Sequence, residues 1–212
     1  MMAEIKIHVF HTGEVCVAPD LPFGGEHCST IKASGAFAKK SERLWLPVSA
    51  YLIECSHGKI IFDCGWHRNM SPDGVFDKKA QIKSLGSLPL YVTNQGRIEK
   101  GLAIDEQLAA LGIHPADLDL VLLSHLDCDH TNGLNLVADA KQILVSKDEL
   151  LFAENKTPST ASATMRIGGA ARKCRPSTGT VRKALRENPT MYLGMKASLW
   201  SISLVIPKGY VR

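Results

Sequence analysis

Several features of membrane, secreted and zinc-finger proteins are missing from this sequence. No apolar run approaches the roughly 18 residues that span a bilayer, so we expect no membrane-spanning helix. The N-terminus, Met1 to Lys6, lacks the charged start, apolar middle and small-residue cleavage site of a signal peptide. None of the six cysteines stands in a Cys-x-x-Cys pair or at zinc-finger spacing. These absences predict a cytoplasmic protein whose cysteines are reduced and packed as small apolar residues.

Histidine and acidic residues are scarce in the last part of the chain. None of the eight histidines follows His130, and from Asn155 onward eleven lysines and arginines stand against one acid, Glu187. The part before Asn155 has 14 basic and 20 acidic residues, so the formal charge changes from −6 to +10 at this point. One folded domain rarely changes composition so sharply. We therefore predict a unit over residues 1–154 and a basic, atypical, poorly ordered tail over residues 155–212.

The densest cluster of ionisable side chains lies in the segment Ser124–Gly133. His125, Asp127, Asp129 and His130 come directly after the apolar run 118–123, which predicts a buried strand. Imidazole nitrogens and carboxylate oxygens suit zinc, iron or manganese. We therefore predict a metal site in this loop. The alternative is a solvated loop in which the acids and histidines only pair with one another.

This segment also carries a family resemblance. The run His125-Leu126-Asp127-Cys128-Asp129-His130 resembles the His-x-His-x-Asp-His signature of the metallo-β-lactamase superfamily. Asp127 stands where most members have the second histidine, and this variant resembles the branch of N-acyl homoserine lactone lactonases. The resemblance implies an α/β fold, the αββα sandwich of two sheets, with only its N-terminal half matched by residues 1–154. It also implies two metal ions, zinc in the first instance with iron or manganese as alternatives. His125 and Asp127 would hold one ion, and Asp129 and His130 the other.

The resemblance also implies an activity. It is hydrolysis of a lactone or related ester by a metal-activated hydroxide, a quorum-quenching reaction, with Asp129 orienting the hydroxide. A small-molecule lactone or ester is then the expected partner. Asp63, in Asp63-Cys64-Gly65 at the end of an apolar segment, would lie beneath the metals and brace their ligands. The alternative is an ordinary aspartate that caps a turn at the end of a strand.

The remaining pattern predicts elements around this loop. Strands are expected at residues 5–11, 45–55, 59–65 and 142–145, and a short helix at 104–112, capped by Asp105 and ended by Gly112. Residues 20–25 and most of 72–101 are expected to be loops because of their glycine and proline content. His8 is expected on the polar face of the first strand, His11 in the turn that follows, and His67 in solvent, all three without metal.

The resemblance stops near Phe152, before the residues that would complete two metal sites. The superfamily supplies these from a Pro-Gly-His-Thr turn, a bridging aspartate and a last histidine. Codons compatible with residues 201–209 spell Asn-Ile-Pro-Gly-His-Thr-Lys-Gly when they are read two bases later. Codons compatible with residues 159–169 and 186–200 give further family-like segments at the same offset. We hypothesise a frameshift between Glu154 and Pro158 that leaves the chain truncated as an enzyme and impaired.

The alternative for the tail is a genuine basic domain. The chain would then be a binder of nucleic acid or of a membrane surface, or a remnant without enzymatic activity. The basic residues of the tail are scattered and lack interleaved aromatic side chains, which makes nucleic-acid binding a weak case. Nothing in the sequence predicts an oligomeric state.

Overall fold

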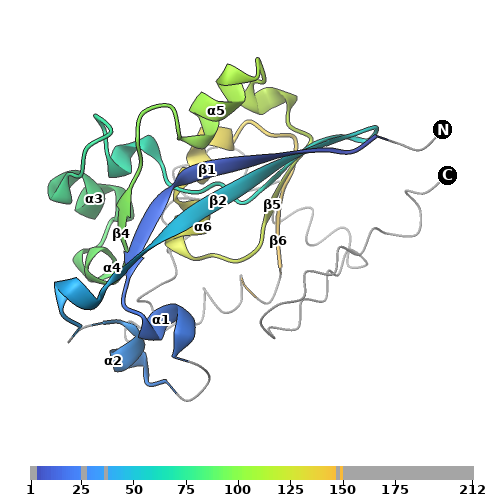
Figure 1. Ribbon diagram of the computed structural model, residues 1–212. Helices are drawn as coiled ribbons and strands as arrows, with labels where there is room; N and C mark the ends of the chain where they lie inside the picture. Colours follow the sequence, from blue (N-terminus) through green and yellow to red (C-terminus); the bar gives the residue numbers. More distant parts are fainter. Residues whose placement is uncertain (1–3, 25–27, 36–37, 147–148, 150–212) are drawn as a thin grey trace.

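The computed structural model of this chain describes residues 4–24, 28–35, 38–146 and 149. Its strands form one sheet in the order β4-β1-β2-β3-β5-β6 (Figure 1). The strands are β1 (Lys6–Val17), β2 (Leu44–Cys55), β3 (Gly58–Phe62), β4 (Gln95–Arg97), β5 (Leu120–Leu123) and β6 (Ile143–Val145). The pairs β4-β1, β1-β2 and β2-β3 are antiparallel, whereas β5 runs parallel to β3 and β6 runs parallel to β5. The five strands predicted from the sequence are therefore confirmed, and β4 is an additional strand.

A β-bulge in β1 places Phe10 and Val15 on the same face of the sheet. The pairing with β2 runs from Lys6 to His11, shifts, and resumes at Glu14. Gly13 takes a φ of 104° inside the bulge, where an added Cβ would come 2.3 Å from the carbonyl oxygen of Arg97. The extra residue restores the alternation of side chains, so Phe10 before the bulge and Val15 after it are both buried. The prediction that His11 lies in a turn is wrong, because β1 continues through the bulge.

Helices cover one face of the sheet. They are α1 (Asp20–Phe23), α2 (Thr30–Ala33), α3 (Lys78–Leu85), α4 (Leu88–Thr93), α5 (Ile104–Ala110) and α6 (Cys128–Thr131). Short 3-10 helices are η1 (Lys40–Glu42), η2 (Arg68–Met70), η3 (Pro115–Asp117) and η4 (Asn132–Val137). Leu108 of α5 packs with Leu52 and Ile61 of the sheet in one apolar cluster, and Leu85 of α3 packs with Trp66 in a second. Figure 1 shows α5 above β1, and α3 and α4 beside β4. Among the described residues, no helix is both long enough and apolar enough to cross a membrane.

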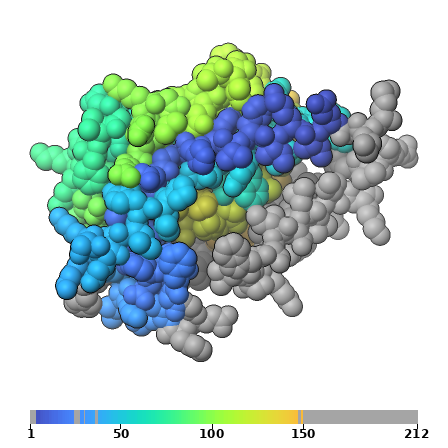
Figure 2. Space-filling model, viewed as in Figure 1, coloured from blue at the N-terminus to red at the C-terminus, as the bar shows by residue number. Residues whose placement is uncertain are grey.

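The other face of the central strands is less covered, and we call it the open face. It consists of Ile7 and Val9 of β1, Tyr51 and Ile53 of β2, and Phe62 of β3. Ile7 is 59% exposed, Val9 54% and Tyr51 37%. Strand pairing places Val9 beside Tyr51 and Tyr51 beside Phe62, whose rings meet edge to face at 6.4 Å. Figure 2 shows β1, in dark blue, running across the surface of the molecule.

Two segments expected to be loops contain helices. Between residues 72 and 101 the chain forms α3, α4 and β4. The Asp77 carboxylate accepts the backbone N–H groups of Lys79 and Ala80 at 2.8 and 3.0 Å, and the Ser87 hydroxyl accepts that of Leu90 at 3.4 Å. These polar residues therefore cap helices, although their composition resembles that of a loop. Residues 20–23 likewise form the single turn α1.

Helix α5 begins one residue earlier than its predicted N-cap. Ala103 is the capping residue, and its backbone N–H is accepted by the Glu106 carboxylate at 3.0 Å. Gly112, with a φ of 70°, follows the end of the helix as predicted. Leu108 is fully buried, whereas Leu111 is 43% exposed. The expected cap at Asp105 is therefore wrong by two positions.

Arg68 joins three segments that are distant in the sequence. Its guanidinium donates to both carboxylate oxygens of Glu106, and to the carbonyl oxygens of Ile98 and Glu99 at 3.1 and 2.6 Å. The hydrogen bond from Arg68 lowers the pKa of Glu106. The ion pair therefore holds the start of α5 against η2 and the strand β4 region.

Replacing Glu106 with glutamine is expected to lower the free energy of unfolding by about 1–3 kcal/mol, because a largely buried guanidinium loses its charged partner. The folded pKa of Glu106 lies below its ordinary value of 4.5, so its contribution is complete above that pH and is lost as the pH falls through the lowered folded value. The variant should therefore lose less stability on acidification than the parent. Urea unfolding followed by tryptophan fluorescence at several pH values measures both effects. Glu99→Gln, at an exposed side chain, is the control, and equal acid sensitivity of E106Q and parent would contradict the prediction.

Candidate metal centre

The candidate site lies where two parallel strands end. Asp63 follows β3 directly and Ser124 follows β5 directly, and β3 and β5 are neighbours in the sheet. Leu122 and Leu123 are buried, so β5 is the buried strand that the sequence predicts. The chain then passes through His125 to Asp127 into the one-turn helix α6. A rigid sheet therefore positions the loop, as a metal or catalytic site requires.

The structure brings the four predicted ligands together in two pairs. Nε2 of His125 lies 3.6 Å from Oδ2 of Asp127, and Nε2 of His130 lies 3.4 Å from Oδ2 of Asp129. The two imidazole rings are 4.0 Å apart between centroids. These are the same pairs into which the family resemblance groups them. Their roles as metal ligands remain predictions.

The donor types fit a catalytic metal, but their number does not complete one. Within the described part of the chain, no group of three or more His, Cys, Asp or Glu side chains is arranged to hold a metal ion. A zinc ion in a protein normally takes at least three protein ligands, and each pair here offers two. Cys128, the thiol within the loop, is fully buried, and burial raises its pKa well above the usual value. The described residues therefore form a partial centre.

Asp63 lies beneath the two histidines. Its Oδ1 accepts the backbone N–H of Ser124 at 2.8 Å, and its Oδ2 accepts the Ser124 hydroxyl at 2.7 Å. The same Oδ2 lies 2.8 Å from Nδ1 of His130, the ring nitrogen opposite Nε2. Asp63 is 3% exposed and has a φ of 60°, a conformation that few residues other than glycine adopt. Its partners Ser124 and His130 are distant in the sequence, so Asp63 joins the end of β3 to the loop after β5. That it braces metal ligands stays a prediction.

The electrostatics of the loop depend on these carboxylates. Burial would lower the pKa of His130, but the hydrogen bond to Asp63 and the charges of Asp129, Asp63 and Asp127 outweigh it and raise that pKa to about 9. Burial also raises the pKa of Asp129, which the neighbouring His130 partly offsets. At neutral pH the metal-free His130 is therefore protonated, and a metal ion must displace that proton to bind.

Backbone contacts fasten α6 and η4 to the segment after β3. The N–H of Cys64 donates to the carbonyl of His130 at 2.9 Å, and that of Gly133 donates to the carbonyl of Gly65 at 2.8 Å. The side-chain oxygen of Asn132 accepts the N–H of His67 at 2.9 Å. Gly133 packs so closely that an added Cβ would lie 2.4 Å from the carbonyl oxygen of Cys64. Neither Ser124 nor Asn132 was predicted from the sequence, although Ser124 is next to His125 and Asn132 is two residues from His130.

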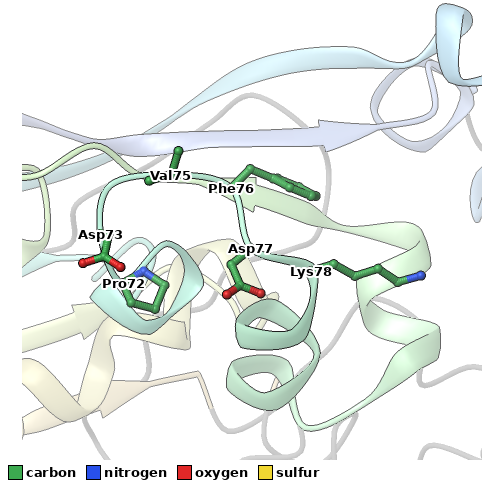
Figure 3. Close-up of a pocket in the computed structure, with 6 residues that line it drawn as sticks. All are labelled: Pro72, Asp73, Val75, Phe76, Asp77 and Lys78. Atoms are coloured by element: carbon green, nitrogen blue, oxygen red, sulfur yellow. The ribbon is translucent and has the colours of Figure 1, made fainter.

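The other histidines stay outside the centre. His67 is half-buried: its Nδ1 accepts the N–H of Asn69 at 2.9 Å, and burial lowers its pKa, so the expectation of a solvated side chain is wrong. His8 lies 2.9 Å from Oε1 of Glu54 on the neighbouring strand. A surface hollow of about 340 Å³ also lies apart from the centre. It is lined by one segment before and into α3, residues 72, 73 and 75–78. Figure 3 shows its side chains, among which are none of the four predicted ligands.

A match to a known family identifies the superfamily of the chain that carries this centre. Residues 43–190 match the family described as the metallo-beta-lactamase superfamily. The chain belongs to this superfamily. The match runs past Phe152, where the resemblance read from the sequence stops, so the boundary between residues 154 and 155 remains a prediction.

Curated relatives in the superfamily support the expected branch. The chain is 28% identical over 149 residues to the N-acyl homoserine lactonase AiiB of Agrobacterium fabrum, which is 70% of this chain and 49% of that protein. The identity and the coverage are the same for the N-acyl homoserine lactonase AiiB of Rhizobium rhizogenes. The chain thus spans about half the length of these relatives.

Solved structures confirm the fold. An N-acyl homoserine lactone hydrolase with N-hexanoyl-L-homoserine bound at its catalytic metal centre matches with a TM-score of 0.52 at 20% identity, over 77% of this chain and 56% of that one. A probable metal-dependent hydrolase from Staphylococcus aureus matches with a TM-score of 0.51 at 21% identity, over 76% and 54%. The predicted α/β fold of the metallo-β-lactamase type is therefore confirmed. In the described residues it appears as one sheet with helices on one face.

Proposed function

We propose that this chain carries the first half of the metal centre of a hydrolase that opens lactones or related esters. One observation carries the proposal: His125 pairs with Asp127 and His130 with Asp129 above a buried carboxylate, at the end of two parallel strands. The names of the AiiB relatives support the lactone class. Zinc is the proposed metal, with iron or manganese as alternatives, because all three accept mixed nitrogen and oxygen ligands.

Each residue of the loop has a proposed role in this chemistry. A metal pair bound at such a centre supplies Lewis acidity and a water of lowered pKa. His125 and Asp127 would hold one metal and Asp129 and His130 the other. Asp63 would fix the ring of His130 from behind. Asp129 is the proposed catalytic residue. Its carboxylate would accept a hydrogen bond from the attacking water and orient it, and burial raises the pKa of this carboxyl above its usual value.

The 212-residue chain is proposed to be impaired. Two donors per metal bind weakly, and the further donors must come from outside the described residues. The tail offers no histidine and one acid, which cannot replace the missing ligands. We retain the hypothesis that residues 155–212 are read out of frame, which accounts for their composition. The alternative of nucleic-acid or membrane-surface binding falls on the same residues, outside those that the structure describes.

Restoring the second reading frame in the gene tests the proposal. The frame-restored chain is expected to retain two metals through purification and to open N-hexanoyl homoserine lactone. The 212-residue chain should bind metal only weakly and leave the lactone intact. In the restored chain, Asp129→Asn should lower the rate by about 10²–10⁴-fold, as loss of a proton-transfer group does. Elemental analysis gives the metal content, and proton release gives the rate.

The controls separate the parts of the proposal. Asp139→Asn makes the same change at an exposed aspartate and should leave the rate unchanged. Two tightly held metals and full turnover in the 212-residue chain would refute the frameshift. A restored chain that holds two metals without opening the lactone would refute the substrate class.

A further inference from the structure

We propose that Ser124 is a positioning residue that sets the tautomer of His125, so that Nε2 of this ring is free to bind a metal. The inference rests on the proposed function only in assigning Nε2 of His125 to metal binding. The hydrogen-bond geometry itself is independent of it. Nothing in the motif assigns Ser124 a role, since serine is not a typical ligand of zinc.

A count of protons leads to this assignment. The Ser124 hydroxyl oxygen lies 2.7 Å from Oδ2 of Asp63 and 2.8 Å from Nδ1 of His125. A hydroxyl has one proton to donate, and a carboxylate can only accept. The proton of Ser124 therefore goes to Asp63, and its lone pair faces His125. Nδ1 of His125 must then carry the ring proton, which leaves the lone pair on Nε2.

The backbone keeps Ser124 in this position. Its own N–H donates to Oδ1 of Asp63 at 2.8 Å, so serine and carboxylate form two parallel hydrogen bonds. The N–H of Asp63 donates in turn to the carbonyl of Leu122 at 2.9 Å, which fixes the carboxylate to β5. Ser124 thus has little freedom to turn its lone pair away from His125.

One carboxylate then orients both histidines. Oδ2 of Asp63 accepts from His130 directly, and it orients His125 through the hydroxyl of Ser124. The Nε2 atoms that remain are those next to Asp129 and Asp127, on the side of the ring pair away from Asp63. Without the hydroxyl, only His125 loses its fixed tautomer. This asymmetry between the two rings is the signature of the proposed role.

Solid-state nitrogen NMR of the full-length, metal-free chain, labelled with ¹⁵N at histidine, tests the proposal. Spectra are recorded above the His130 pKa of about 9, so that the His130 ring is neutral. His125→Ala and His130→Ala identify the two signals. In the parent chain both rings are expected as the Nδ1–H tautomer. Ser124→Ala should lose this tautomer at His125 alone, and Ser124→Thr, which keeps the hydroxyl, should retain it at both.

Metal binding provides the second readout. Cobalt titration is expected to show a roughly 10–100-fold weaker affinity for Ser124→Ala and a nearly unchanged one for Ser124→Thr, as for other residues that orient a ligand. An Nε2–H tautomer of His125 in the parent chain would overturn the proposal, whatever the variants do. So would equal cobalt affinity in the parent and Ser124→Ala. A failure to open lactones would refute the proposed function and leave the tautomer result intact.

Discussion

Gly65→Ala is expected to be among the most destabilising single substitutions in this chain, at about 3 kcal/mol or more, because it combines overpacking with a strained backbone. Gly65 has a φ of 62°, and an added Cβ would lie 1.9 Å from Oγ1 and 2.2 Å from Cβ of Thr12. Thr12 is fully buried in β1, and its hydroxyl donates to the carbonyl of Val48 at 3.2 Å. Neither partner can move without disturbing the centre of the sheet.

Gly112→Ala is the matched control for this prediction. Gly112 has a φ of 70°, and an added Cβ meets no atom within 4 Å. The control therefore introduces the same backbone strain without the collision, and should cost about 1 kcal/mol. Urea unfolding followed by tryptophan fluorescence measures both. Equal losses at the two positions would show that the contact with Thr12 relaxes freely, contrary to the prediction.

Asp63→Ala should cost about 3–5 kcal/mol and remove measurable metal binding, since it leaves a half-buried histidine and serine without their common acceptor. Alanine also has to adopt the φ of 60° that aspartate tolerates better. Asp63→Asn keeps the shape and the backbone conformation while removing the charge. It should therefore lie between the alanine variant and the parent in both stability and metal affinity.

Asp119→Ala provides a control at the opposite end of the same two strands. Oδ2 of Asp119 accepts the N–H of Lys59 at 2.8 Å, so this aspartate also links β3 to β5. It is partly exposed, and its loss should cost only about 1 kcal/mol and leave cobalt binding unchanged. For Asp63→Ala, Asp63→Asn and Asp119→Ala, cobalt titration measures the metal affinity and urea unfolding measures the free energy of unfolding. Similar losses for Asp63→Ala and Asp119→Ala would mean that Asp63 only links strands.

The sequence predicted those parts of the fold in which the hydrophobic pattern is typical of only one kind of secondary structure. The alternation in Ile7 to Val9 and the apolar run before Ser124 each indicated a strand, and each strand is present. Asp77 and Ser87 lie in a segment predicted to be mostly loop, because the same residue types cap helices and form turns. Only their contacts with the N–H groups of Lys79 and Leu90 identify them as helix caps. Local composition could not reveal those contacts.

The same limit applies to the centre. The spacing of His125 and His130 suffices to recognise a ligand loop, and the family resemblance pointed to Asp63. The role of Ser124 depends on a hydroxyl that meets a carboxylate 61 positions away, which no local pattern encodes. The link from Asn132 to His67 is likewise non-local, because it requires η4 to pack against the turn after β3.

The open face bears on how long such a chain survives in a cell. Val9 and Tyr51 present apolar side chains to water in the middle of a sheet, where most folded proteins have covered them. Chaperones and proteases recognise surfaces of this kind, and they act continuously on chains that expose them. The steady-state amount of this protein would then be governed by its clearance rather than by its synthesis. The open face, on the side of the sheet away from the helices, would thus lower the amount of this protein even though its ligand loop is intact.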